Sequence, residues 1–220
     1  RGTARQIRSG GPSRAWWVRV EENERDEGRR TAVAVSTEGT AEPLRLAVLL
    51  GSTREGRVGG VVGEWFRARA AGRAGLRVET VDLVDYAFPA RFPEEPTAEM
   101  CRFAGAIDRA EAFVVVTPEY NWGYPASLKQ AVDYAYDEWH AKPVGFVSYG
   151  HGGCGLLAAA GLRLVFNELR SVTVRNAVSV DLDGPLGGPE QECAADGLLA
   201  ELVWWGLALR EAKARRPYVS

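Results

Sequence analysis

Residues 117–125 carry the side chains whose types and spacing best suit the binding of a small ligand. The stretch follows an apolar run of strand length and precedes a helical run, 126–136. Its aromatic rings offer flat apolar surface, Glu119 and Asn121 offer polar groups, and Pro118 fixes its own φ and has no N–H donor. Because open α/β sheets bind ligands at the carboxyl ends of their strands, we expect a planar, partly polar ligand here.

A second loop, residues 51–58, has the composition of a phosphate-binding turn. The first backbone N–H groups of the helix that follows carry partial positive charge. Ser52 and Thr53 add hydroxyl donors, and Arg54 and Arg57 add forked cationic donors that match phosphate oxygens. The glycine spacing resembles that of a nucleotide P-loop, but arginine and valine stand where the lysine and the hydroxyl residue belong. The loop therefore predicts a phosphomonoester site, with a simple helix-capping turn as the alternative.

A third loop, residues 148–155, contains four glycines in its last six positions. Glycine lets a backbone come close to a ligand, so we expect a wall against a flat ring, with a flexible connector as the alternative. The glycine spacing matches a dinucleotide fingerprint, but the acid expected about 20 residues later is missing. We interpret His151 as an exposed loop residue and Cys154 as a small packed thiol. Glu119 is expected to order backbone groups or face solvent, without an acid–base role.

The elements that must position these loops alternate between strands and helices from residue 44 onward. The predicted strands cover 44–50, 76–83, 113–117, 143–149 and 172–180, and the predicted helices cover 58–74, 98–109, 126–136, 156–169 and 193–214. Thr97 is expected to cap the second helix. Such alternation predicts an α/β fold with helices on both faces of a parallel sheet. Five strands fit a flavodoxin-like three-layer sandwich with strand order 2-1-3-4-5.

Residues 1–43 differ in composition from the rest of the chain. The Gly/Arg/Ser-rich segment 1–14 and the charged segment 21–30 cannot bury enough apolar surface to offset the entropy of ordering. We therefore predict a disordered extension, followed by one domain over residues 44–215. The apolar run 15–20 leaves open an alternative in which it docks on the domain as an extra strand.

Composition excludes several classes of function. The formal net charge of -2 provides no bulk attraction to nucleic acid or to an anionic membrane. No apolar run approaches the roughly 18 residues that cross a bilayer, and no signal peptide is visible. The three cysteines form neither a disulfide framework nor a zinc spacing, and two histidines argue against a His-rich metal site. We therefore expect a cytoplasmic protein that holds no metal.

Taken together, the three loops resemble those of the NADPH-dependent FMN reductase family, which has a flavodoxin-like fold. The resemblance covers residues 44–213 and is carried by Gly-Ser-Thr-Arg at 51–54, Gly56 and Arg57, Pro-Glu-Tyr-Asn at 118–121, Tyr-Pro-Ala-Ser-Leu-Lys at 124–129, Lys-Pro-Val at 142–144 and Ser-Tyr-Gly at 148–150. The sequence departs from many members at Arg57 and Gly59, where serine and asparagine are common.

The resemblance implies a set of cofactor-binding residues. The phosphate of FMN would lie on Ser52, Thr53, Arg54 and Arg57, the isoalloxazine ring against Pro118, Glu119, Tyr120 and Asn121, and the third loop, with Tyr149, Gly150 and Gly152, beside the other side of the ring. No catalytic side chain is implied, because the flavin itself carries the chemistry.

The implied activity is that of an oxidoreductase that passes hydride from NADPH to FMN and then to a second acceptor, such as a quinone, an azo compound or a flavin. The resemblance also implies a homodimer or homotetramer. Two alternatives stay open: a flavodoxin-like electron-transfer protein that binds FMN without NADPH turnover, and a binding module that has lost flavin turnover. The near-neutral charge and the arginines of the first loop favour the enzyme over the carrier.

Overall fold

The strands and helices alternate along the chain in the predicted order. The computed structural model of the chain describes residues 42–219. The strands are β1 (Leu44–Leu50), β2 (Leu76–Asp82), β3 (Ala112–Pro118), β4 (Pro143–Gly150) and β5 (Val172–Asp181), and the helices are α1 (Gly59–Ala71), α2 (Ala98–Arg109), α3 (Ala126–Asp133), α4 (Leu156–Glu168) and α5 (Pro189–Arg215), with short 3-10 turns at Leu83–Asp85 and Asp137–Trp139. The predicted disordered extension and its extra strand lie outside the described residues, except for Glu42 and Pro43.

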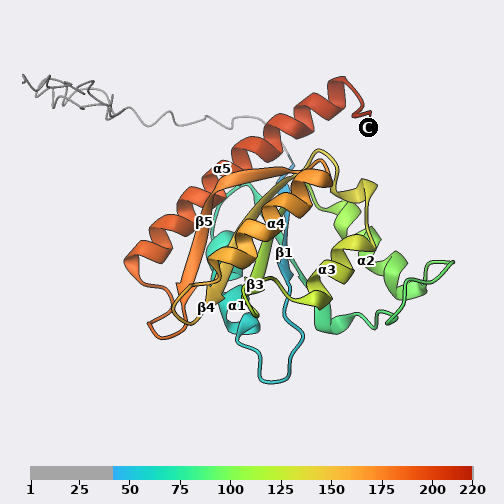
Figure 1. Cartoon of the computed structure of the whole chain (residues 1–220). Coiled ribbons are helices and arrows are strands. Elements are labelled where there is room, and N and C mark those ends of the chain that lie inside the picture. Colours follow the sequence, from blue (N-terminus) through green and yellow to red (C-terminus); the bar gives the residue numbers. More distant parts are fainter. Residues whose placement is uncertain (1–41, 220) are drawn as a thin grey trace, which may run out of the picture. The chain divides into compact units, whose positions relative to one another are not determined.

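The five strands form one parallel sheet in the order β2-β1-β3-β4-β5, which confirms the predicted topology (Figure 1). Central strand β3 is buried along its whole length, as its continuous apolar run requires. Strand β2 alternates between half-buried and exposed residues for most of its length, because it lies at an edge of the sheet. The central strands therefore provide the rigid frame from which the three loops emerge.

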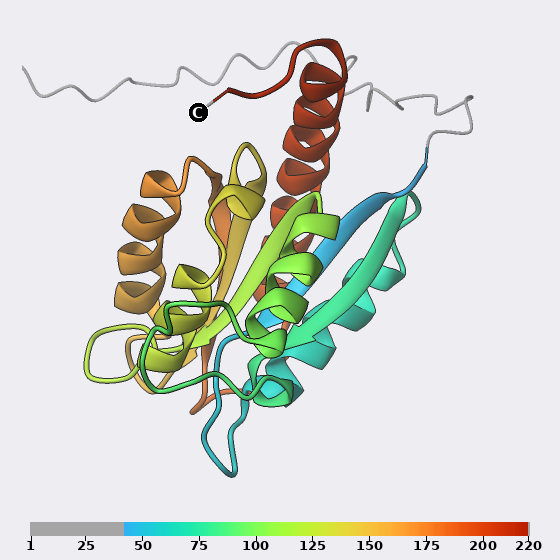
Figure 2. The same ribbon diagram turned by 90° about the vertical axis from the view of Figure 1, so that its right-hand side faces the viewer.

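Helices cover both faces of the sheet and complete a three-layer sandwich (Figure 2). On one face, α2, α3 and α4 bury Phe103, Leu128 and Phe166 against the sheet. On the other face, α1 and α5 bury Phe66 and Leu198. Burying side chains of this size contributes about 1.5–3 kcal/mol each, so the two apolar layers supply the main stabilisation of the fold.

Helix boundaries differ from the prediction where side chains have tertiary partners. The predicted Thr97 cap is present, since its hydroxyl accepts the Met100 N–H at 3.3 Å. Helix α3 ends at Asp133, earlier than predicted, because a 3-10 turn buries Trp139 and directs its Nε1–H to the Val132 carbonyl at 3.1 Å. Helix α5 begins at Pro189, earlier than predicted, where the fixed φ of proline suits the first helical turn.

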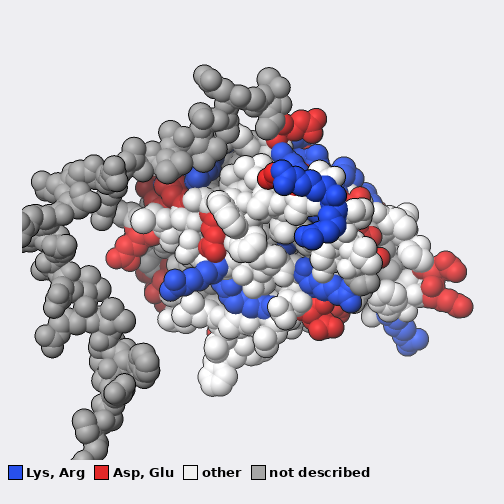
Figure 3. Space-filling model, turned by 90° about the horizontal axis from the view of Figure 1, so that it is seen from above, with Lys and Arg blue, Asp and Glu red and all other residues white. Residues whose placement is uncertain are grey.

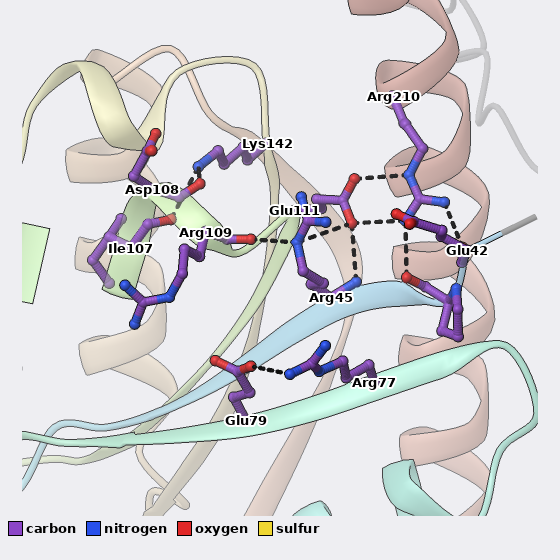
Figure 4. A network of polar contacts seen from close by, with 11 residues as sticks. Glu42, Arg45, Arg77, Glu79, Ile107, Asp108, Arg109, Glu111, Lys142 and Arg210 are labelled. Atoms are coloured by element: carbon purple, nitrogen blue, oxygen red, sulfur yellow. Dashed lines mark hydrogen bonds and ion pairs between the residues drawn. The ribbon is translucent and has the colours of Figure 1, made fainter. Parts of the chain in front are cut away.

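A polar network holds the amino edge of the sheet together (Figure 4). Arg210 of α5 donates to both carboxylate oxygens of Glu111, each at 2.7 Å, and also to the carbonyls of Glu42 and Pro43. The backbone N–H of Arg45 donates to the same carboxylate at 3.1 Å. The network thus fixes α5 to the beginning of β1 and to the residue before β3. Within residues 42–219, no helix is both long enough and apolar enough to cross a membrane.

Candidate functional site

The carboxyl ends of β1, β3 and β4 bring the three predicted loops to one edge of the sheet (Figure 1). The first loop is held to β3, because the Gly51 N–H donates to the Val116 carbonyl at 2.9 Å. The second is held to β4 by a bond of 3.1 Å from the Glu119 N–H to the Tyr149 carbonyl. The prediction that these loops converge is therefore confirmed.

Two buried hydroxyl groups meet at the beginning of α1. Ser52, from the first loop, is 1% exposed and Tyr149, from β4, is 3% exposed. A Cβ atom added at Gly59 would lie 2.2 Å from Ser52 Oγ and 2.5 Å from Tyr149 Oη, so only glycine leaves room for both. Neither hydroxyl has a hydrogen-bond partner among the described residues. Because an unpaired buried hydroxyl costs free energy, this pair indicates a polar ligand.

The electrostatics at this point favour an anion. Helix α1 has no side-chain cap at Val58 and no acidic residue in its first turn, so neither of these neutralises its positive end. Burial raises the pKa of Tyr149 to about 12, although the nearby Ser52 hydroxyl acts in the opposite direction. Tyr149 is therefore a neutral hydroxyl donor at physiological pH. Two donors and a free helix end together match a phosphate group.

Thr53 and Arg54 connect the first loop to its neighbours. The Thr53 hydroxyl donates to Ser127 Oγ, at the beginning of α3, over 3.2 Å. The exposed guanidinium of Arg54 lies over the ring of Tyr120, with its central carbon 3.5 Å from the ring centroid. This cation–π contact joins the predicted phosphate loop to the predicted ring-binding loop.

Arg57 has partners that the sequence did not indicate. Its guanidinium makes a bidentate ion pair with Asp82, at the end of β2, with Nη1 2.7 Å from Oδ1. Nη1 also donates to the Ser52 carbonyl at 2.8 Å. The Asp82 carboxylate raises the pKa of Arg57 further, while burial acts against it. Arg57 thus braces the first loop against β2, and these bonds argue against the role of a free phosphate ligand.

The second loop turns tightly at its tip. Tyr120 and Gly123 exchange two backbone hydrogen bonds, of 2.8 and 3.1 Å, around Asn121 and Trp122. Both central residues have positive φ, 51° and 64°, which is the conformation of a type I′ turn. The strained turn leaves the Trp122 side chain 83% exposed. Residues other than glycine adopt such backbone angles at a cost in free energy, and strained residues of this kind are common at functional sites.

Glu119 and the glycine-rich loop pack against each other. Glu119 Oε2 accepts the N–H groups of Leu157 and Ala158, at 2.9 and 3.3 Å, so it caps α4 and orders backbone groups as expected. At Gly155, φ is +76° and an added Cβ would lie 2.7 Å from the Tyr149 nitrogen. Gly155 therefore lets the third loop fold back on β4. Gly150 and Gly153 lie next to Glu119 of the second loop, whereas an added Cβ at Gly152 would meet no atom within 4 Å.

Comparison with known protein families identifies the family of this chain. Residues 44–184 match the family described as NADPH-dependent FMN reductase, which is more than half of the chain. The chain belongs to the NADPH-dependent FMN reductase family.

Two of the curated relatives come from yeasts. An NAD(P)H-dependent FMN reductase of Schizosaccharomyces pombe is 38% identical over 121 residues, which cover 50% of this chain and 60% of that protein. One of Saccharomyces cerevisiae is 33% identical over 132 residues, which cover 50% of this chain and 68% of that protein. The matches thus span about two thirds or less of the relatives' length.

Solved structures show the same fold. An oxidoreductase from Corynebacterium diphtheriae superposes with a TM-score of 0.64 at 19% identity, covering 76% of this chain and 99% of that one. A flavoenzyme NAD(P)H:acceptor oxidoreductase from Paracoccus denitrificans superposes with a TM-score of 0.61 at 20% identity, covering 76% and 98%. At this identity the likeness concerns the fold alone.

The residues present at the edge of the sheet fit the cofactor that the family name implies. A reductase of FMN needs a seat for a phosphate group and a surface for a flat ring. The unpartnered hydroxyls of Ser52 and Tyr149 suit the first need, and the turn at 120–123 with the glycine-rich loop suits the second. The described residues contain no group of three or more His, Cys, Asp or Glu that could hold a metal ion.

Two acidic residues of this family member's site were missed by the sequence reasoning. Asp82 pairs with Arg57, and the Asp183 carboxylate accepts a hydrogen bond from His151, with Oδ1 2.8 Å from Nδ1. Asp82 is 25 residues from its partner and Asp183 is 32 residues from His151. No short-range pattern links residues so far apart, and only the parallel register of β1 with β2 and of β4 with β5 could have suggested them.

Proposed function

We propose that this chain is an FMN-dependent NAD(P)H oxidoreductase that passes hydride from NADPH to FMN and then to a second acceptor, such as a quinone, an azo compound or a flavin. The observation that carries the proposal is the pair of buried, unpartnered hydroxyls of Ser52 and Tyr149 at the uncapped end of α1. Membership of the NADPH-dependent FMN reductase family supports the same activity. When bound, FMN would supply the hydride-transfer chemistry.

The phosphate end of the cofactor would be held by the first loop and by β4. In this proposal Ser52, Thr53 and Tyr149 donate hydroxyl hydrogens, and the exposed Arg54 supplies positive charge. Arg57 keeps its bonds to Asp82 and acts as a positioning residue for the loop. In this proposal Tyr149 binds the phosphate and not, as the sequence predicted, the side of the ring. The reason is that its hydroxyl lies next to Ser52 and Gly59.

The ring end would lie against the second and third loops. Pro118, Glu119, Tyr120 and Asn121 would contribute mainly backbone and flat surface, since the Glu119 carboxylate is already bonded to α4. Gly150 and Gly152 would let the third loop approach the ring closely. Backbone N–H groups near the ring would stabilise negative charge in the reduced cofactor, so no acid–base side chain is needed.

A spectroscopic titration tests this proposal. Purified chain mixed with FMN should show a shifted and quenched flavin spectrum, and adding NADPH without oxygen should bleach it. Binding without bleaching would favour the electron carrier that lacks NADPH turnover. Failure to bind FMN would overturn the proposal. Quinone, azo dye and free flavin, added singly to the bleached protein, would then identify the acceptor by the return of colour.

We also propose that the protein acts as a homo-oligomer. Leu156, Leu157 and Leu164 of α4 are 58%, 51% and 76% exposed, and Leu157 and Leu164 share one face of the helix. The strained, exposed Trp122 belongs to the loop that Glu119 ties to the same helix. An apolar face of this kind is expected to be covered in the working protein.

A further inference from the structure

A cavity of about 610 Å³ lies at the amino edge of the sheet, at the opposite end from the candidate cofactor site. Its walls come from the last turns of α5, from the segment 216–219, and from the turns that precede β4 and β5. The volume falls in the range of small-molecule sites. The cavity is therefore separate from the proposed function and does not depend on it.

Three cationic side chains line this cavity: Arg170, Lys213 and Arg216. None of the three forms an ion pair with a described residue, and none of the described lining residues is acidic. Neighbouring arginines behave differently, since Arg210 pairs with Glu111 and Arg215 pairs with Glu211. Figure 3, which looks onto this end of the molecule, shows several Lys and Arg side chains close together.

The ammonium group of Lys213 is partly buried, which favours the binding of an anion. Its pKa is lowered by burial, and the more distant carboxylates of Glu111 and Asp108 oppose that effect. Glu111 is itself bonded to Arg210, so it is committed elsewhere. A partly desolvated ammonium group without a close counter-ion gains more from a bound anion than an exposed one does.

The backbone around the cavity is strained at two lining residues. Ala141 and Arg170 both have positive φ, 51° and 55°. Arg170 follows the end of α4, where glycine is the usual residue in this conformation. Cations after helix ends stabilise those helices, which accounts for part of the charge here. A cation in the last turn of α4 would stabilise the helix equally well without a strained backbone. Helix stabilisation therefore does not explain why an arginine occupies position 170.

The rest of the cavity is apolar and aromatic. Val172, Leu209 and Tyr218 form its walls. The Tyr218 ring packs edge-on to His140, with ring centroids 6.1 Å apart. The His140 side chain is 7% exposed, and its Nε2 has no hydrogen-bond partner among the described residues. A flat apolar body with an anionic group would therefore satisfy both kinds of wall.

We propose that this cavity binds a small aromatic phosphate monoester, with the phosphate on Arg170, Lys213 and Arg216 and the aromatic body against Tyr218. Three unpaired cations match the charge of about -1.5 to -2 on such a phosphate near neutral pH. Guanidinium groups also match the fork geometry of phosphate oxygens. A carboxylate carries less charge and should bind more weakly.

Titration calorimetry with the full chain tests the site, using phenyl phosphate as the probe and benzoate, phenol and inorganic phosphate for comparison. Phenyl phosphate should bind with the highest affinity of the four. Arg170→Gln and Lys213→Gln should each weaken it about tenfold or more. Arg215→Gln is the matched control, because Arg215 sits at the same helix end but is paired with Glu211 and does not line the cavity. Arg54→Gln reports on the other candidate phosphate site.

The outcomes separate the alternatives. Loss of affinity in the two cavity variants, with none in Arg215→Gln, supports the site, whether or not Arg54→Gln removes a second phosphate site. Absence of saturable binding, equal loss in Arg215→Gln, or loss only in Arg54→Gln overturns it. Equal binding of benzoate overturns the assignment to phosphate. Arg170→Gly adds an independent check, because relief of the strained φ should raise the unfolding temperature while the affinity falls; a lower unfolding temperature would show that Arg170 has a structural role instead.

Discussion

Tyr149 is the residue at which stability and binding are expected to oppose each other. Its hydroxyl is buried beside that of Ser52 and has no partner in the described part of the chain. Free energy is therefore spent in the unliganded fold to keep a donor available. Polar groups held in this way are typical of sites that complete their hydrogen bonds with a ligand.

Tyr149→Phe should consequently stabilise the unliganded protein by about 1 kcal/mol and weaken FMN about tenfold, since a charge-assisted bond to phosphate is lost. Riboflavin, which lacks the phosphate, should bind the variant and the native chain equally well. Thermal unfolding and fluorescence titration measure the two effects. Tyr134→Phe is the control, because that hydroxyl donates to the Pro89 carbonyl at 2.9 Å and its removal should only destabilise. Weaker riboflavin binding by Tyr149→Phe would contradict the phosphate assignment.

Substitutions should show that Arg54 binds the ligand and that Arg57 stabilises the fold. Arg57→Gln should destabilise the fold by about 1–2 kcal/mol, because it leaves Asp82 partly buried without its partner. Asp82→Asn should have a similar effect. Arg54→Gln, at an exposed residue, should leave the unfolding temperature nearly unchanged and weaken FMN far more than riboflavin. If Arg57→Gln instead lowered FMN affinity selectively at unchanged stability, the original assignment of Arg57 to the phosphate would be restored.

At the scale of elements, Glu119 links the second loop to the beginning of α4. The carboxylate satisfies two N–H groups that the helix cannot bond internally. Glu119→Ala should therefore cost about 1–2 kcal/mol of stability and increase hydrogen exchange in the first turn of α4. Unchanged exchange at Leu157 and Ala158 would show that this cap contributes little.

The exposed face of α4 makes a second prediction at this scale. Leu164→Glu places a charge on the proposed contact surface, so it should convert the oligomer to a monomer without loss of folding. Light scattering after size-exclusion chromatography measures the mass, and circular dichroism checks the fold. The control is Leu207→Glu, a partly exposed leucine on α5, on the other face of the sheet. A native chain that is already monomeric would refute the proposed assembly.

For the whole molecule, the buried Lys142 predicts how stability depends on pH. Its ammonium group donates to the Ile107 and Asp108 carbonyls at the end of α2, at 3.0 and 2.8 Å (Figure 4). Burial nevertheless lowers the pKa of Lys142 from 10.5 to about 8. Between these values the folded chain binds fewer protons than the unfolded chain, so the free energy of unfolding rises with pH.

The difference in unfolding free energy between the native chain and Lys142→Met should therefore grow in favour of the native chain between pH 8 and 10.5. The full change is up to about 3 kcal/mol, at about 1.4 kcal/mol per pH unit. Urea unfolding at several pH values measures it. Lys129→Met, at a more exposed lysine paired with Asp133, is the control and should give no comparable rise. A flat difference for Lys142 would mean that the two carbonyls keep the ammonium charged.

Local patterns were sufficient for the fold and for the convergence of the three loops at one edge of the sheet. Apolar runs predicted β1, β3 and β4 within one or two residues, because buried parallel strands require continuous apolar side chains. Strand–helix alternation then leaves few topologies, and the carboxyl edge of the sheet follows from the fold class. The loops at 51–58, 117–125 and 148–155 were identified because glycine, proline and arginine restrict local backbone and charge in recognisable ways.

The partners of individual side chains were decided only by the tertiary structure. Arg57 looked equivalent to Arg54 in the sequence, yet the parallel pairing of β1 with β2 brings Asp82 to Arg57 and leaves Arg54 exposed over Tyr120. Tyr149 likewise reaches Ser52 because β3, which lies between β1 and β4, keeps both loops at one edge. Such contacts join residues 25 to about 100 positions apart. No local sequence pattern predicts them, because the entropic cost of closing such long loops is met only when the sheet forms.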